Sequence, residues 1–90
     1  MGTPNLSDDA IDFVRGISPK HARQILLKII ALCNDSRPND AQPLKNSPEG
    51  YWRADIGEYR IIYREVDDVL EIPLVGKRND DEVYKRLSRK

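Results

Sequence analysis

The sequence contains one cysteine, one histidine and one tryptophan in 90 residues. The single cysteine, Cys33, excludes an intramolecular disulfide, and one cysteine with one histidine cannot form a zinc site unaided. No hydrophobic run approaches the roughly 20 residues needed to cross a bilayer, and the N-terminus has no signal-peptide pattern. We therefore expect a cytoplasmic protein that does not associate with membranes.

The usual catalytic constellations are also missing. The sequence has no Gly-rich phosphate loop, no cluster of metal ligands and no Ser/His/Asp set. We expect His21, early in the second predicted helix, to be a surface histidine rather than a general base. An enzyme built from this chain therefore has to work with arginine, lysine and tyrosine, with no metal and no small-molecule cofactor.

The sequence has no excess charge of either sign, with 15 basic and 15 acidic residues. This balance is unfavourable for nucleic-acid binding, because phosphate affinity comes largely from clustered Lys and Arg. The distribution is uneven, however. Residues 45–76 hold four basic against seven acidic residues, whereas residues 77–90 hold six against three. Positive charge is thus concentrated at the C-terminal end.

Helical signals occupy residues 7–34 of what we expect to be one domain, 1–90, since a second domain would leave neither half enough interior. Ser7 is a candidate N-cap, and Ser18 followed by Pro19 begins a second helix. The short link between the helices predicts an antiparallel helical hairpin. Cys33 lies on its apolar face and is expected in the core.

Strand signals follow a proline-rich connection at residues 35–50. Residues 51–56, 59–66 and 69–75 read as strands joined by two-residue loops. The predicted fold is α+β: the helical hairpin packs on an antiparallel three- to four-stranded β-meander (51–75). A C-terminal motif and tail (76–90) follow, with a short helix near residues 80–87.

Two sequence features concern the edge strands of this sheet. Residues 1–6 are poor in β-formers and contain Pro4, so a strand there is expected to be short, irregular or absent. Pro73 removes a hydrogen-bond donor inside the last strand and indicates an edge or a bulge.

The two-residue loops fix the register, so the two faces of the meander can be assigned. The core face is predicted to carry Trp52, Ala54, Ile56, Tyr59, Ile61, Tyr63, Leu70, Ile72 and Leu74. The opposite face, here called the arginine face, is predicted to carry Tyr51, Arg53, Asp55, Arg60, Ile62, Arg64 and Glu71.

The arginine face has two interpretations. It can be a solvated strand surface with cross-strand ion pairs, Asp55 to Arg60 and Glu71 to Arg64. Alternatively, its arginines bind an RNA phosphate and stabilise the charge that builds during cleavage. The segment 76–84 also has two interpretations. It is a turn followed by a capped helix, or it brings Arg78 and Tyr84 to the edge of this face.

Several blocks of sequence resemble one known family. They are Tyr51-Trp52-Arg53, then Gly57-Glu58-Tyr59-Arg60-Ile61-Ile62-Tyr63, then Gly76-Lys77-Arg78 with Glu82-Val83-Tyr84. Together with Leu44-Lys45 they are similar to the RelE branch of the RelE/ParE toxin superfamily, over roughly residues 44–87. The resemblance implies a type II toxin that cleaves mRNA on the ribosome, where the RNA 2′-hydroxyl attacks the adjacent phosphate.

The resemblance also implies a site. Arg53, Arg60, Arg78 and Tyr84 match the family's catalytic positions. A second basic position of the family corresponds to Asp55, which either neutralises Arg60 or itself accepts the 2′-hydroxyl proton. Further RNA contacts are expected from Lys45, Arg64, Lys77 and Lys85.

Two other functions fit the same fold. One is a ParE-like inhibitor of DNA gyrase, and the other is a degenerate member that mainly binds its antitoxin. All three imply a cognate antitoxin as partner, with a disordered segment that folds across the toxin. The nuclease alternative adds the ribosome and its mRNA as partners.

Overall fold

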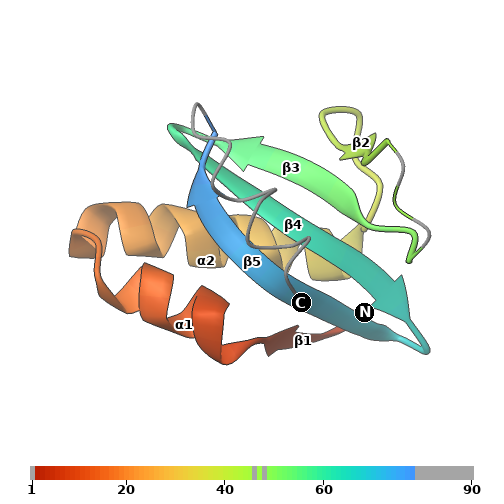
Figure 1. The fold of residues 1–90 in the computed structure, drawn as a ribbon, viewed down its shortest axis with the longest axis horizontal. Coiled ribbons are helices and arrows are strands. Elements are labelled where there is room, and N and C mark those ends of the chain that lie inside the picture. The colour runs from red at the N-terminus through yellow and green to blue at the C-terminus, as the bar shows by residue number, and fades with distance from the viewer. Residues whose placement is uncertain (1, 46, 48, 79–90) are drawn as a thin grey trace.

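The computed structural model describes residues 2–45, 47 and 49–78, which form a mixed sheet covered on one face by two helices (Figure 1). The strands are β1 (Thr3–Leu6), β2 (Gln42–Pro43), β3 (Trp52–Ile56), β4 (Tyr59–Val66) and β5 (Val69–Lys77). Their order across the sheet is β1-β5-β4-β3-β2. The predicted α+β class is correct, and the expected C-terminal helix falls outside the described residues.

The sheet is wider than the predicted meander, and it is not fully antiparallel. β1 pairs with β5 in parallel, with Thr3 opposite Val69 and Leu6 opposite Ile72. Backbone hydrogen bonds hold its first residues, from Gly2 N to the Cys33 carbonyl at 2.8 Å and from Thr3 N to the Asp68 carbonyl at 3.0 Å. Its β-propensity is low, so tertiary pairing rather than local preference forms this strand.

The region 35–50, expected to be irregular, contributes the short strand β2. It pairs antiparallel to β3, with Gln42 opposite Arg53. Pro43 fits there because a strand at the edge of a sheet leaves one side of its backbone unpaired.

The helices α1 (Asp8–Arg15) and α2 (Pro19–Asn34) begin where the sequence indicates. The Ser7 hydroxyl accepts a hydrogen bond from Ala10 N, and the Ser18 hydroxyl caps α2 with Pro19 at its first position. The predicted helical hairpin is only partly correct. α1 packs more extensively on β5 than on α2, so each helix is held mainly by the sheet. Neither helix is long and apolar enough to span a membrane within the described part of the chain.

The main core lies between the helices and the sheet, and most predicted core residues are in it. Ile61, Leu70 and Ala54 are fully buried, and Tyr63 is 1% exposed. Cys33 is buried as expected, and burial raises the pKa of its thiol, which favours the neutral form. His21 departs from expectation: it is half-buried, with Nδ1 2.9 Å from the Tyr59 hydroxyl.

A β-bulge at Pro73 corrects one core assignment. Ile62 is opposite Leu74 and Arg64 is opposite Glu71, so two residues of β5 face the single residue Tyr63 of β4. The extra residue reverses the parity of β5 beyond it. Val75 therefore enters the main core, while Leu74 turns to the arginine face. The predicted bulge is confirmed, but its effect on Leu74 was missed.

The two hairpin loops have the expected lengths. Gly57 has a φ of 56°, as the first position of a type II′ turn requires. In the other loop Asp67 and Asp68 have φ values of 50° and 67°. Two consecutive positive φ values are typical of a type I′ turn, which matches the twist of the strands it joins.

Candidate functional site

The arginine face carries the side chains that its register predicted, arranged in rows across the strands. The first row, beside the β3–β4 loop, joins Asp55 to Arg60 and Gly76. The second row joins Arg53, Ile62 and Leu74. Ile62 and Leu74 are fully buried beneath Leu44 and Tyr51, so the face has an apolar centre. Its charged groups surround that centre rather than forming a continuous basic stripe.

The first row contains a close ion pair. Arg60 donates from Nε to Asp55 Oδ1 at 2.7 Å and from Nη2 to Oδ2 at 3.2 Å. The Arg60 side chain is 13% exposed and that of Asp55 is 36% exposed. The hydrogen bonds from Arg60 lower the pKa of Asp55, and the charges of Arg60, Arg53 and Arg78 act in the same direction. The carboxylate is therefore ionised and oriented by arginine.

Arg53 and Arg78 flank this pair and have no carboxylate partner among the described residues. Arg53 donates a short hydrogen bond from Nη2 to the side-chain oxygen of Gln42 on β2. Arg78 donates through its backbone N–H to the Glu58 carbonyl at 2.9 Å and through Nη1 to the Gly57 carbonyl at 3.4 Å. These neutral acceptors hold the two side chains, and neither arginine forms an ion pair within the described residues.

A third row holds Arg64 on the far side of the apolar centre. Its Nε donates to Glu71 at 2.7 Å, and its guanidinium lies 5.0 Å from the centre of the Tyr51 ring. The hydrogen bond that Arg64 donates to Glu71 raises the pKa of Arg64. Both predicted cross-strand ion pairs are thus present. Within the described residues Arg60 and Arg64 are ion-paired, whereas Arg53 and Arg78 are not.

The other predicted site residues lie in different parts of the chain, and two of them fall outside the described residues. Lys77 and Lys45 are exposed. Lys77 is the last residue of β5 and precedes Arg78. Lys45 follows β2, which is the edge strand beyond β4 and β3. Tyr84 and Lys85 lie outside the described residues, as does any contact they make. No group of His, Cys, Asp or Glu side chains in the described ranges is arranged to hold a metal ion.

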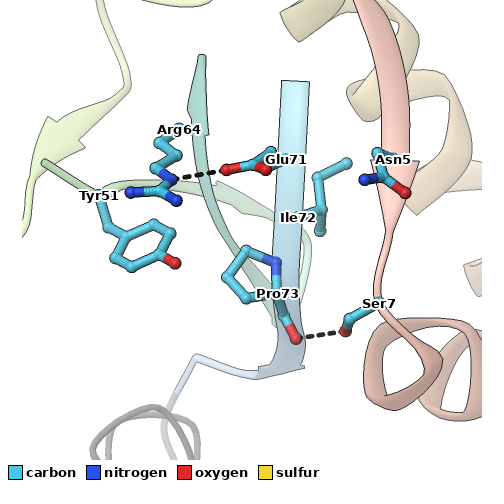
Figure 2. A pocket seen from close by; sticks show the side chains of 7 residues that line it. All are labelled: Asn5, Ser7, Tyr51, Arg64, Glu71, Ile72 and Pro73. Atoms are coloured by element: carbon cyan, nitrogen blue, oxygen red, sulfur yellow. Dashed lines mark hydrogen bonds and ion pairs between the residues drawn. The ribbon is translucent and has the colours of Figure 1, made fainter. Parts of the chain in front are cut away.

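The structure adds a shallow open groove of about 200 Å³ that sequence reasoning missed (Figure 2). It runs over β5 between the third row and β1, and its walls include Asn5, Ser7, Tyr51, Arg64, Glu71 and Pro73. Ser7 Oγ closes one side by donating to the Pro73 carbonyl at 2.6 Å. No local signal pointed to this groove, because β1 reaches β5 only through a parallel pairing distant in sequence.

Comparison with known families identifies the class of protein. Residues 6–82 match the family described as ParE toxin of type II toxin-antitoxin system, parDE. This match spans most of the chain, including both helices and every strand from β2 to β5. The chain therefore belongs to the RelE/ParE superfamily of type II toxins. A comparison with curated protein sequences gives no significant match.

Solved structures share the fold. RelE from Pyrococcus horikoshii OT3, in complex with RelB, is 22% identical, with a TM-score of 0.74 over 86% of this chain and 94% of that chain. Isolated Escherichia coli RelE is 19% identical, with a TM-score of 0.74 over 99% and 97%. YafQ from Escherichia coli BL21(DE3) is 20% identical, with a TM-score of 0.68 over 88% and 96%. At such identities the likeness establishes the fold alone.

Proposed function

We propose that this toxin is a metal-independent endoribonuclease that cleaves mRNA on the ribosome and so inhibits translation. The observation that carries the proposal is the grouping of Arg53, Arg60 and Arg78 around Asp55 on one end of the arginine face. Two of these arginines, Arg53 and Arg78, form no ion pair in the part of the chain that the structure describes, so their charge can serve a phosphate. The ribosome as target makes the cytoplasm the site of action.

The proposed reaction is attack of the RNA 2′-hydroxyl on the adjacent phosphate. It needs a proton acceptor for that hydroxyl, positive charge around the phosphorane-like transition state and a proton donor for the 5′-oxygen that leaves. Arg53, Arg60 and Arg78 supply the charge. Tyr84 is our proposed participant in proton transfer, and the proposed RNA-binding residues are Lys45, Arg64, Lys77 and Lys85.

Asp55 is better suited to orient Arg60 than to accept the proton. An efficient general base has a pKa near the working pH, and arginine contacts shift the pKa of Asp55 in the opposite direction. We therefore propose that the carboxylate fixes the guanidinium of Arg60 in a single orientation. The same contact offsets part of the charge of Arg60, which leaves Arg53 and Arg78 as the stronger attractants for phosphate.

An antitoxin is the proposed protein partner. RelE of Pyrococcus horikoshii is found in complex with RelB. In this chain the outer face of α2 leaves Leu26, Leu27 and Ile30 between 44% and 59% exposed. Exposed apolar side chains grouped on one helix are typical of an interaction surface. A disordered antitoxin segment that folds on this face would cover it.

Inhibition of DNA gyrase is the second candidate, favoured by one observation: the matching family is described by the ParE toxin. It requires a binding surface and no cleavage. A supercoiling assay with purified gyrase separates the two functions, because a nuclease leaves supercoiling unchanged.

The nuclease proposal is tested by inducing the protein in growing cells and mapping new 5′ ends on translated messages. We expect cuts linked to the reading frame with the wild type and far fewer with Arg60→Ala or Arg78→Ala. Arg23→Ala is the matched control, since Arg23 is exposed on α2, on the helix-covered side of the sheet. Growth arrest without codon-linked cuts, or arrest unchanged in both site variants, would overturn the proposal.

A further inference from the structure

The groove over β5 is lined by groups suited to a planar ring with polar edges (Figure 2). One wall is the ring of Tyr51, and the guanidinium of Arg64 lies over that ring. An aromatic ring and an arginine plane are the surfaces on which proteins stack unpaired nucleobases.

The opposite wall offers further polar groups. Asn5 faces Glu71 across the β1–β5 pairing, so both side chains emerge on the same side of the sheet. Neither the Asn5 amide nor the Tyr51 hydroxyl has a hydrogen-bond partner in the described ranges. Glu71 accepts from Arg64 through Oε1. An amide beside a carboxylate can read the donors and acceptors on the edge of a base.

The charge of the groove argues against a phosphate as its occupant. Glu71 compensates the guanidinium of Arg64 directly, at 2.7 Å. A phosphate would meet this carboxylate, whereas Arg53 lies in the second row and Arg78 lies beside the β3–β4 loop. The groove and the arginine cluster therefore suit different parts of a nucleotide chain.

The spacing allows one RNA strand to use both places. Arg60 and Arg64 are four residues apart on β4, which at about 3.3 Å per residue is about 13 Å. A strand whose scissile phosphate lies at Arg60 can thus present a neighbouring base to the groove.

We propose that this groove binds one unpaired nucleobase of the RNA near the cleaved bond, placed against Tyr51 and the Arg64 guanidinium and read at its edge by Asn5 and Glu71. The inference rests on the proposed function and assigns a sequence-reading role to residues outside the arginine cluster. Glu71 is an acceptor, so bases with an exocyclic amino group (adenine, cytosine and guanine) are favoured over uracil, which has none.

Binding is tested first without any cleavage. Isotope-labelled wild-type protein is titrated with AMP, CMP, GMP and UMP, and with inorganic phosphate, while amide NMR signals are followed. We expect base-dependent shifts of the Asn5 side-chain amide and of Ile72, weakest with UMP and absent with phosphate. Asn5→Ala should weaken the base-dependent response on the order of tenfold. Equal shifts with all four nucleotides, or shifts confined to the arginine cluster, would overturn the inference.

The second test maps 5′ ends in cells for Asn5→Ala and Tyr51→Leu. Both variants should keep cutting but lose the base preference at one position beside the cut. Thr3→Ala is the matched control, because Thr3 is exposed two residues earlier on β1 and outside the groove. Tyr51 also packs on Ile62 and Leu74, so the exposed Asn5 provides the variant that leaves the core intact.

The two proposals fail in different ways. If neither the wild type nor any variant cuts mRNA, but the nucleotide titration still shows base-dependent shifts, the nuclease proposal is contradicted and the base-binding groove is supported. If cutting persists with an unchanged base preference in both groove variants, the groove assignment fails and the nuclease stands.

Discussion

Arg60 donates two hydrogen bonds to Asp55 from the facing position on the neighbouring strand, at 2.7 Å and 3.2 Å. The contact is a consequence of the two-residue loop at Gly57, which fixes the register of β3 against β4. It places a carboxylate inside the cluster that we propose binds phosphate. Substitution of Asp55 can distinguish a role in orienting Arg60 from the role of a general base.

Asp55→Asn should keep RNA cleavage within about tenfold of wild type, because the amide oxygen can still accept from Arg60. Asp55→Ala removes the acceptor and should lower the rate on the order of 100-fold, the cost of a misplaced catalytic group. Cleavage rates on ribosome-bound mRNA across pH distinguish the roles. Equal loss in both variants, with an altered pH profile, would instead assign proton transfer to Asp55.

Arg60 and Arg78 should differ in how well lysine replaces them. The planar guanidinium of Arg60 donates two hydrogen bonds to Asp55, and a lysine ammonium cannot reproduce this geometry. Arg60→Lys should therefore lose nearly as much cleavage activity as Arg60→Ala, about 100- to 1000-fold. Among the described residues the Arg78 side chain makes one long hydrogen bond, of 3.4 Å, so its charge is expected to matter more than its shape. Arg78→Lys should therefore retain most cleavage, measured in the same assay. Equal behaviour of the two lysine variants would contradict this distinction.

Tyr63→Phe tests a buried polar contact in the core. The Tyr63 hydroxyl donates to the Ser36 carbonyl at 2.5 Å, so its removal should lower the free energy of unfolding by about 1 kcal/mol. Burial raises the pKa of Tyr63 to about 12. The unfolded chain ionises at a lower pKa, near 10, so stability is fully present below pH 10 and is lost as pH rises towards 12.

Urea unfolding at a series of pH values between 8 and about 12 checks this expectation. Wild type should lose stability more steeply above pH 10 than Tyr63→Phe, so the difference between them should shrink with rising pH. Parallel curves would show that Tyr63 ionises equally in the folded and unfolded states.

The Asp67-Asp68 loop offers a stabilising change. Both residues have positive φ, which costs free energy for a residue with a side chain and least for Asn and Gly. Replacing the pair by Asn-Gly should raise the free energy of unfolding by about 0.5–1 kcal/mol, measured in urea. Gly57→Ala is the opposite control, since alanine at a φ of 56° should destabilise the protein by a similar amount.

Leu27→Glu tests the outer face of α2 as a partner surface. Leu27 is 59% exposed, so the substitution should change the free energy of unfolding by less than about 0.5 kcal/mol. Co-purification with the cognate antitoxin should fall sharply, because a charge would face the apolar side of the bound segment. Lys20→Glu, exposed in the first turn of α2, is the matched charge control. Undiminished capture by Leu27→Glu would exclude this face.

Local signals in the sequence determined both helices, the three long strands, their hairpin loops and the pairing of Arg60 with Asp55. Caps at Ser7 and Ser18, alternation along the strands and two-residue loops are short-range features, and each acts through neighbours a few residues away. The composition of the arginine face followed from the same register, up to the bulge.

Only the tertiary structure decided what depends on distant contacts. β1 exists because residues near Thr3 pair with β5, some 66 positions further along, against their own low propensity. The bulge at Pro73 exchanged Leu74 for Val75 in the core, since one inserted residue reverses every later side chain. The groove between Asn5 and Tyr51 depends on the pairing of β1 with β5, because its walls combine residues near the N-terminus with residues far along the chain.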